Sequence, residues 1–412
     1  MTAPAEPQDL LAPELMTDPY GAYARMREQA PVRTVSMMGS PPAVMVTRHD
    51  DVRTVLTDPR FVTDPELAGN AADPMRAAIF EQLGISADLA QYLLRNILTT
   101  DGAEHARLRK LVSRAFTVKR VQGLRPRVEE ITAALLDRMA AADGPVDLVE
   151  AFAYPLPITV ICELVGVPED QRPQWHEWGR DMVALNPERT PTVLRAAVDH
   201  VQELVAARRA APADDLISGL VRAQEDDGDR LSDTELVTMV FALVMAGHET
   251  TAHLITNAVL TLLIHPGQLA VLREDPELWP RAVNELMRLR GPVQFTQFRY
   301  PAEDLELGGT TIARGTPVIA GLLPANHDPR AYDHPDELDV RRYAGPGDGH
   351  LGFGQGPHYC LGAALARQEG EVALRMLFDR FPDLALAVPA SEIVWEPRPG
   401  FSSVAELPVR VH

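Results

Sequence analysis

The longest apolar stretch of the chain, Leu236–Ile264, limits the possible folds more than any other part of the sequence. The residues before it, Ser232-Asp233-Thr234-Glu235, form a capping box with Ser232 as the N-cap and Glu235 at the N3 position. Pro266-Gly267 predicts that the helix ends near His265. A helix of roughly 32 residues is about 48 Å long. Because the segment is so apolar, we expect this helix to cross the middle of a globular protein.

The remaining sequence predicts a mainly α fold with a minor β sheet region. Apolar residues recur with mostly helical spacing from about His49 to Leu289. Strand-like runs lie toward the two ends of the chain, at Val32–Ser36, Ala43–Thr47, within Leu305–Ala320 and at Val404–Val411. No linker or internal repeat divides the 412 residues. We therefore expect an N-terminal arm at residues 1–20 and one large domain at residues 21–412.

Charge and cysteine content restrict the function. The formal net charge is −19, which makes binding to nucleic acid or to anionic membranes a poor hypothesis. The N-terminal residues have no apolar core, and the long helix contains His248, Glu249 and Asn257, so we expect neither a signal peptide nor a membrane anchor. Two cysteines in unlike contexts, Cys162 and Cys360, fit a reducing, cytoplasmic setting. Nothing in the sequence demands more than a monomer.

A glycine-rich loop, Phe353–Gly362, contains Cys360 and, two residues before it, His358. Glycine lets a backbone approach a flat ligand closely, and a thiolate in such a loop is a good ligand for a soft or borderline metal. A helix predicted at Ala363–Phe381 places its N-terminus beside the sulfur, where it favours the ionised form. Taken alone, the loop also fits an incidental glycine-rich turn. A structural zinc site with His350 as a further ligand is another alternative, but it lacks a fourth ligand.

Ala246-Gly247-His248-Glu249-Thr250-Thr251 lies midway along the long helix. Small residues allow a flat cofactor or O2 to lie against the backbone, although glycine costs a helix about 1 kcal/mol. The Thr250 hydroxyl can bond to the Ala246 carbonyl four residues back, and an acid beside an alcohol is a plausible proton-delivery pair. The alternative is simple helix packing around a back-bonded threonine.

The two motifs together, Phe-Gly-x-Gly-x-His-x-Cys-x-Gly and Ala-Gly-x-Glu-Thr, resemble the haem-ligand loop and the oxygen-activation motif of the cytochrome P450 family. The resemblance implies haem b with Cys360 as its axial thiolate ligand, under a long central helix that crosses over the haem. It implies that Thr250 hydrogen-bonds dioxygen and that Glu249 helps to relay protons. Phe353, Gly354, Ala246 and Gly247 would contact the cofactor.

The resemblance extends to residues that would hold the two haem propionates, which need cationic or hydrogen-bonding partners. Asp101-Gly102-Ala103-Glu104-His105-Ala106-Arg107-Leu108-Arg109 resembles the family helix that supplies a histidine and an arginine, here His105 and Arg109. Arg299 matches the arginine that precedes the family's strand pair, and His358 completes the expected set.

A Glu-x-x-Arg pair, Glu285 and Arg288, has spacing that places both side chains on one helix face. In isolation this would be an ordinary surface ion pair. Its place between the long helix and the cysteine loop resembles the family's buried structural pair. The family usually adds an arginine where this chain has Glu337, so either Glu337 pairs with Arg288 or Arg341 or Arg342 substitutes.

Eight basic residues occur between Arg107 and Arg127 with no acid among them. One interpretation is a solvated helix face. The other is a docking surface for an acidic partner. Because the segment resembles the helix beside the cysteine face of the haem, an acidic iron–sulfur ferredoxin is the expected partner. The residues assigned to this surface are Arg107, Lys110, Arg114, Lys119 and Arg120.

The resemblance spans residues 18–409 and is nearest to soluble actinobacterial members that tailor macrolides and other polyketides. It implies a monooxygenase that inserts one atom of O2 into a lipophilic substrate by hydroxylation or epoxidation. Electrons would come from NAD(P)H through a separate reductase and ferredoxin. A terpenoid, steroid, fatty acid or cyclic peptide substrate, a peroxide-driven enzyme and a non-catalytic haem-thiolate sensor are alternatives. The expected substrate pocket includes Leu243, Ala246, Val293, Gln294, Phe295, Phe401 and Ser402, with parts of Phe61–Leu98 and Pro168–Leu194.

Overall fold

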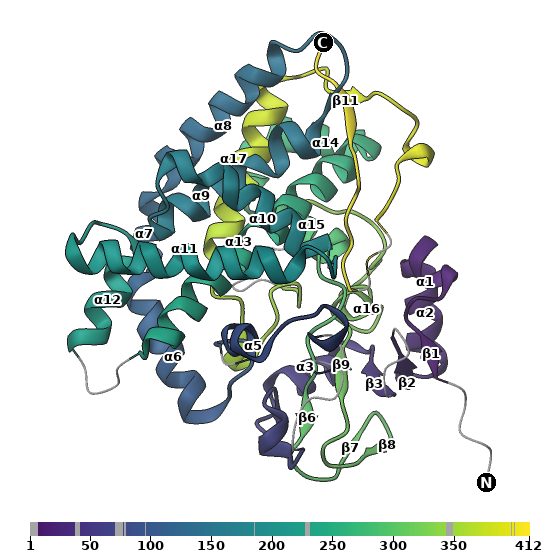
Figure 1. Cartoon of the computed structure of the whole chain (residues 1–412). Coiled ribbons are helices and arrows are strands. Elements are labelled where there is room, and N and C mark those ends of the chain that lie inside the picture. Colours follow the sequence, from purple (N-terminus) through teal and green to yellow (C-terminus); the bar gives the residue numbers. More distant parts are fainter. Residues whose placement is uncertain are drawn as a thin grey trace.

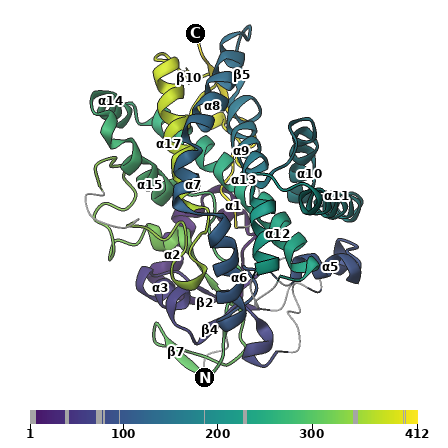
Figure 2. The same ribbon diagram turned by 90° about the vertical axis from the view of Figure 1, so that its left-hand side faces the viewer.

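The computed structural model describes residues 7–37, 42–70, 77, 80–94, 96–184, 186–226, 231–342, 349–396, 398 and 400–412. Helices fill most of the molecule, and the short strands gather at two opposite ends of it (Figures 1 and 2). The expected mainly α fold with a minor sheet region is confirmed. The segments Phe61–Leu98 and Pro168–Leu194, expected to contribute to the substrate pocket, lie partly outside the described residues.

Helix α13, Asp233–Ile264, is the long central helix that the sequence predicts. The capping box is complete, because the Ser232 side chain accepts from the Glu235 N–H and the Glu235 side chain accepts from the Ser232 N–H. Most of its residues are buried along the whole length. Helices α9, α11, α15 and α17 pack around it, and in Figure 2 it lies between α17 and α11.

The other helices surround this axis. Their bounds are α1 Pro13–Thr17, α2 Pro19–Gln29, α3 His49–Thr57, α5 Ala87–Leu94, α6 Gly102–Ala115, α7 Val118–Gly123, α8 Arg125–Ala140, α9 Pro155–Val165, α10 Arg172–Ala184, α11 Thr190–Ala210, α12 Leu216–Asp226, α14 Pro266–Glu274, α15 Trp279–Arg290, α16 Leu322–Asn326 and α17 Ala363–Arg380. Within the described residues, no helix alone has the length and apolar composition to cross a bilayer, and α13 and α14 pass that test only as a pair bent by 102°.

The strands form small sheets. A four-stranded sheet has the order β1-β2-β3-β9, and a three-stranded sheet at the other end of the molecule has the order β10-β11-β5 (Figure 1). The first contains β1 Gln8–Asp9, β2 Val32–Ser36, β3 Ala43–Val46 and β9 Val318–Ala320; the second contains β5 Val146–Asp147, β10 Ala385–Leu386 and β11 Pro408–Arg410. Two further pairs join β4 Phe61–Val62 to β6 Tyr300–Pro301 and β7 Leu305–Leu307 to β8 Thr310–Ile312.

The four predicted strand regions are therefore confirmed, with one correction. Strands β4 and β5 lie inside the stretch that the sequence predicts to be helical, because each is only two residues long and pairs with a distant segment. Residues 7–20, the described part of the expected arm, contain β1, α1 and the start of α2, and Leu10 and Leu15 are buried in them. The division into arm and domain remains a prediction.

Candidate active site

The cysteine loop is held in a tight conformation before α17. The Cys360 N–H donates to the Phe353 carbonyl at 2.9 Å, which closes the loop. Gly356 has a φ of +76°, and a Cβ there would lie 2.6 Å from the Leu56 carbonyl oxygen, so glycine is required. The Arg367 guanidinium lies 4.6 Å from the centre of the Phe353 ring. These contacts present the Cys360 side chain at the start of α17.

The Cys360 thiol is partly exposed and faces several groups that favour a thiolate. Burial raises its pKa above the ordinary value, and the Gly362 and Ala363 N–H groups and the Arg109 and Arg367 charges offset part of that rise. These N–H groups lie at the N-terminus of α17, as the sequence predicts for a helix that follows the loop. Cys162, in contrast, is fully buried in α9, and burial raises its pKa to about 12. Of the two sulfurs, only Cys360 is accessible to a ligand.

One short stripe of α13 is open although the helix runs through the core. Leu243 and Thr250 are partly exposed and Ala246 is exposed, with the spacing of three and four residues that places them on one helix face. Gly247 lies differently: a Cβ there would be 3.1 Å from Ile161 of α9, so its small size permits close packing of two helices. The expected contact of Gly247 with a cofactor remains a prediction.

The acid and the alcohol of α13 have separate partners. The Thr250 hydroxyl donates to the Ala246 carbonyl at 3.0 Å, as the sequence predicts. The Glu249 carboxylate binds the Arg398 guanidinium and lies 3.3 Å from His253 Nε2. Burial raises the Glu249 pKa, but the hydrogen bonds from these two partners outweigh it, so the pKa is below its usual range. Arg398 was not predicted, because no sequence signal connects residues 149 positions apart.

His248 is satisfied inside the protein. It is fully buried, its Nδ1 lies 2.8 Å from the Val244 carbonyl and its Nε2 lies 3.1 Å from the Tyr154 hydroxyl. Because a carbonyl can only accept, Nδ1 carries the proton and Nε2 accepts from the tyrosine. This residue is a structural part of the contact between α13 and the start of α9.

The four basic residues expected at a cofactor edge come together. His105 and His358 stack with ring centres 4.2 Å apart, and Asp101 lies 3.1 Å from His358 Nε2. Burial raises the Asp101 pKa, but hydrogen bonds, of which that from His358 is the strongest, bring it to about 2. The ionised carboxylate can only accept, so His358 Nε2 donates.

This cationic cluster (His105, Arg109, Arg299 and His358) contains two arginine charges and, among the described residues, one acid that acts on it, Asp101. Burial and the neighbouring cations lower the pKa of His105 to about 4. His105 Nε2 is buried without a hydrogen-bond partner among the described residues. Arg299 is 5% exposed, and burial lowers its pKa while Asp101 partly compensates. Arg109 is half-buried and its charge acts on Cys360. A ligand with two carboxylates would satisfy these groups, and haem, with its two propionates beside a thiol ligand, fits.

The Glu-x-x-Arg pair is buried, and Arg342 joins it. Arg288 donates from Nε and Nη2 to the Glu285 carboxylate, both at 2.8 Å, and both side chains are 0% exposed. Arg342 Nε donates to the same carboxylate at 3.0 Å. The Glu337 side chain is exposed and only its backbone carbonyl accepts from Arg288. Of the alternatives that the sequence leaves open, the structure selects Arg342 as the third member.

The expected pocket residues near the C-terminus meet at one place. Val293 and Phe401 form an isolated antiparallel bridge. Gln294 Nε2 donates to the Phe401 carbonyl at 2.9 Å and to the Ser402 hydroxyl at 3.2 Å. Phe295 lies against Gly400, where an added Cβ would be 3.0 Å from its ring. Their role as pocket residues remains a prediction.

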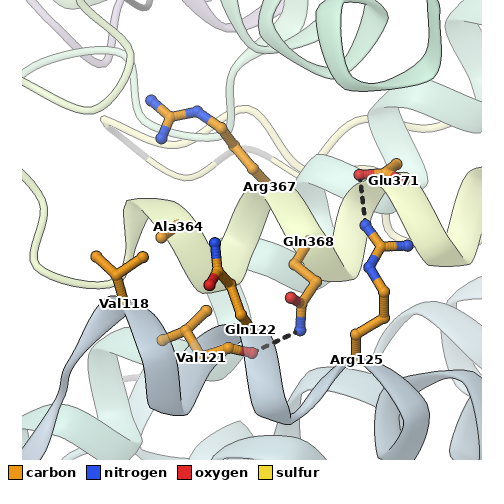
Figure 3. Close-up of a pocket in the computed structure, with 8 residues that line it drawn as sticks. All are labelled: Val118, Val121, Gln122, Arg125, Ala364, Arg367, Gln368 and Glu371. Atoms are coloured by element: carbon orange, nitrogen blue, oxygen red, sulfur yellow. Dashed lines mark hydrogen bonds and ion pairs between the residues drawn. The ribbon is translucent and has the colours of Figure 1, made fainter. Parts of the chain in front are cut away.

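The basic segment is partly neutralised. Arg107 pairs with Glu235 and Arg120 pairs with Asp214, so these two charges are not free as the sequence suggests. Lys110, Arg114 and Lys119 are exposed, and neither lysine forms an ion pair with another described residue. Beside them a hollow of about 410 Å³ lies between α7 and α17 (Figure 3). Its lining includes Val118, which is 64% exposed, and Arg367, which contacts the cysteine loop.

Fold and site together define the class of haem-thiolate proteins: a central helix with an open face, an accessible thiol at a helix N-terminus and a cationic cluster for two carboxylates. Among the described residues no group of three His, Cys, Asp or Glu side chains could hold a metal ion, so the zinc alternative lacks its ligands.

Comparisons with known proteins agree with the assignment to the haem-thiolate class. The cytochrome P450 family model matches residues 191–384. The 6-deoxyerythronolide B hydroxylase of Saccharopolyspora erythraea is 42% identical over 406 residues, 98% of either chain. The polyketide biosynthesis cytochrome P450 PksS of Bacillus subtilis is 37% identical over 402 residues, 96% of either chain. The structure of the tirandamycin C-bound P450 monooxygenase TamI matches with a TM-score of 0.88 at 38% identity, covering 98% of this chain and 100% of that chain. The chain belongs to the cytochrome P450 family.

The chain is thus a haem-dependent monooxygenase with a cysteine thiolate as the axial ligand of its cofactor. When bound, haem supplies the redox chemistry that inserts one oxygen atom from O2 into a substrate bond and releases the other as water. The protein holds the cofactor, orients the substrate and moves protons.

Proposed function

We propose that this enzyme oxidises a polyketide, macrolides among them, by hydroxylation or epoxidation, with Cys360 as the haem ligand. The observation that carries the site assignment is the accessible Cys360 thiol together with the cationic cluster, in which His105 Nε2 is buried and has no hydrogen-bond partner among the described residues. His105, Arg109, Arg299 and His358 hold the propionates. The substrate assignment is supported by two of the similar proteins, one a 6-deoxyerythronolide B hydroxylase and one a polyketide biosynthesis cytochrome P450.

In this proposal Thr250 and Glu249 deliver protons. Thr250 lies on the open face of α13 and its hydroxyl can exchange the Ala246 carbonyl for a ligand. Glu249 is ionised at neutral pH, because Arg398 and His253 lower its pKa, and can therefore accept a proton from solvent and pass it on. A non-catalytic sensor would need neither residue.

The substrate proposal is tested by titrating the holoenzyme with 6-deoxyerythronolide B, tirandamycin C, testosterone and myristic acid. A ligand that displaces water from the cofactor shifts the Soret band. We expect saturable shifts with one or both of the first two compounds and weaker binding of the steroid and the fatty acid. Tight binding of only the steroid or the fatty acid would overturn the polyketide assignment and leave the monooxygenase assignment intact.

We also propose that the exposed cations Lys110, Arg114 and Lys119, with the hollow between α7 and α17, receive an acidic iron–sulfur ferredoxin. The hollow is lined by Ala364, Arg367, Gln368 and Glu371 of α17 (Figure 3). Helix α17 begins at Ala363, directly after the cysteine loop, so a partner seated there would lie against the end of the helix that is nearest to Cys360 in sequence. Lysine charges on an exposed surface act mainly on association and are screened by salt. NAD(P)H and a separate reductase would supply the electrons in the cytoplasm.

The docking proposal is tested by Lys119→Glu in the holoenzyme, with Arg410→Glu as a control that also reverses an exposed charge. We expect Lys119→Glu to slow reduction by a ferredoxin about tenfold at low salt, the range over which electrostatic steering acts, with an unchanged haem spectrum. The Arg410→Glu control should be reduced by the ferredoxin at the wild-type rate. Equal rates for all three proteins would remove this surface as the docking site.

A further inference from the structure

Arg398 contacts the acid of α13 from a segment far away in the sequence. Its Nη1 lies 2.5 Å from Glu249 Oε1, and the two side chains are 24% and 9% exposed. The same guanidinium lies 4.7 Å from the centre of the Phe401 ring. One arginine therefore touches both the proposed proton-delivery acid and a residue of the proposed substrate pocket.

The contact fixes one oxygen of the carboxylate and leaves the other available. His253 Nε2 also faces Glu249 Oε1, at 3.3 Å. For Oε2, no hydrogen bond occurs within the part of the chain that the structure describes. A carboxylate anchored through a single oxygen keeps its orientation and still has a free oxygen that can accept a proton.

The segment that carries Arg398 is itself anchored. Asn257 of α13 donates to the Ser402 carbonyl at 2.8 Å, and Gln294 donates to the Phe401 carbonyl at 2.9 Å. Glu396 accepts from the Ser403 hydroxyl at 2.7 Å and lies 3.6 Å from Arg398. The arginine is thus connected to a backbone segment that cannot move without disturbing several hydrogen bonds.

We propose that Arg398 is a positioning residue that anchors one oxygen of Glu249 and ties this carboxylate to the segment 400–403. The inference rests on the proposed role of Glu249 in proton delivery. Arg398 does not touch the reacting atoms. It holds the acid in place and connects its position to Phe401, so a substrate seated against Phe401 and the proton-delivery acid are arranged together.

The charged and titratable groups that act on Glu249 come from three elements. They are His248 and His253 of α13, Tyr154 before α9, and Arg398. Burial raises the Glu249 pKa, and His253 and Arg398 reverse that effect. When Arg398 is replaced by a neutral residue, burial remains, so the pKa rises. As the pH falls, Glu249 is then protonated at a higher pH than in the wild type. Once protonated, it can no longer accept a proton.

The test compares the Arg398→Gln, Arg398→Lys and Arg410→Gln holoenzymes with the wild type. Arg410 is a matched control because it is an exposed arginine that bonds only to a backbone carbonyl among the described residues. Infrared difference spectra against Glu249→Gln, recorded over the pH range in which each protein is folded, report protonation of the carboxylate. The second readout is product and peroxide formed per NADH consumed, with 6-deoxyerythronolide B as the probe substrate.

We expect Arg398→Gln to shift the carboxylic-acid band to higher pH and to lower product per NADH by about tenfold. This is less than the roughly 10²–10⁴-fold effect of a positioned acid or base itself, because Glu249 is still present. Arg398→Lys keeps the charge and should retain most of the wild-type band position and most of the product yield. Arg410→Gln should match the wild type in both measurements. An unchanged band and yield in Arg398→Gln, or the same losses in Arg410→Gln, would overturn the inference. If Arg398→Gln does not fold, Arg398→Lys provides the test. If its carboxylic-acid band appears at the same pH as in the wild type, the positive charge at position 398 is what holds the Glu249 pKa down. If the band appears at a higher pH, the inference is contradicted. Failure of the wild type to show a thiolate-ligated haem spectrum would instead remove the proposed function.

Discussion

Replacing Arg342 by Gln should destabilise the protein although Arg342 lies outside the active site. Its Nε donates to the buried Glu285 carboxylate, and its two Nη groups donate to the backbone carbonyls of Asp333, His334 and Glu337. A hydrogen bond to a charged group contributes about 1.5–3 kcal/mol and a neutral one about 0.5–1.5 kcal/mol. Glutamine can replace about one of the four. Because the side chain is 14% exposed and such terms are not additive, we expect a loss of about 3 kcal/mol.

The assay is unfolding by denaturant and by heat, each followed by circular dichroism and by haem absorbance. Unfolding entropy near the midpoint is about 2.1 cal/mol/K per residue, so 3 kcal/mol in a chain of this length lowers Tm by about 3 °C. Arg341→Gln is the matched control, because Arg341 is the neighbouring arginine and is exposed. Glu337→Ala is a second control, since Arg288 and Arg342 bond only to the Glu337 backbone carbonyl and its side chain faces only the exposed His334.

Both controls should change the free energy of unfolding by no more than about 0.5 kcal/mol, the usual range for exposed positions. If Arg342→Gln is as stable as Arg341→Gln, Arg342 does not support the buried pair. If Glu337→Ala is the more damaging change, the third member of the pair is Glu337.

Three further predictions concern the site itself. Thr250→Ala should uncouple oxygen use from product formation, seen as more peroxide per NADH with unchanged substrate affinity, and full coupling would contradict the role of the hydroxyl. Gly356→Ala should cost about 1–3 kcal/mol, because a left-handed residue gains a Cβ against the Leu56 carbonyl; stability equal to the wild type would show that the loop can relax. Asp101 has a pKa lowered to about 2, so its stabilising contribution is present above its ordinary pKa and is lost as the pH falls toward about 2. Asp101→Asn should therefore reduce the acid sensitivity of unfolding, whereas an unchanged pH dependence would contradict the lowered pKa of Asp101, which rests on hydrogen bonds from His358, Thr63 and Asp64.

Sequence patterns predicted correctly those elements whose structure depends on residues close together in the sequence. The capping box fixed the start of α13 at Ser232 and the Pro266-Gly267 pair fixed its end, and both ends agree with the structure. The Thr250 back-bond followed from its spacing to Ala246. Strands β4 and β5 could not be predicted, because two-residue strands are defined by distant partners and carry no periodicity of their own.

The partners of the site residues were harder to predict for the same reason. The sequence indicated Glu249 but not Arg398, and it indicated His358 but not Asp101, although Asp101 is the first residue of the segment that contains His105 and Arg109. Arg342 was one of several alternatives, and only the path of residues 326–342 around Arg288 selected it. Charge pairing across the fold depends on tertiary placement, which a single sequence does not display.

The most direct test of haem ligation by Cys360 is the absorption spectrum of the dithionite-reduced protein with carbon monoxide, recorded for the wild type, Cys360→Ser and Cys162→Ser. We predict a strongly red-shifted Soret band in the wild type and in Cys162→Ser, and loss of that band in Cys360→Ser. A red-shifted band that persists in Cys360→Ser, or its absence from the wild type, would contradict haem ligation by Cys360.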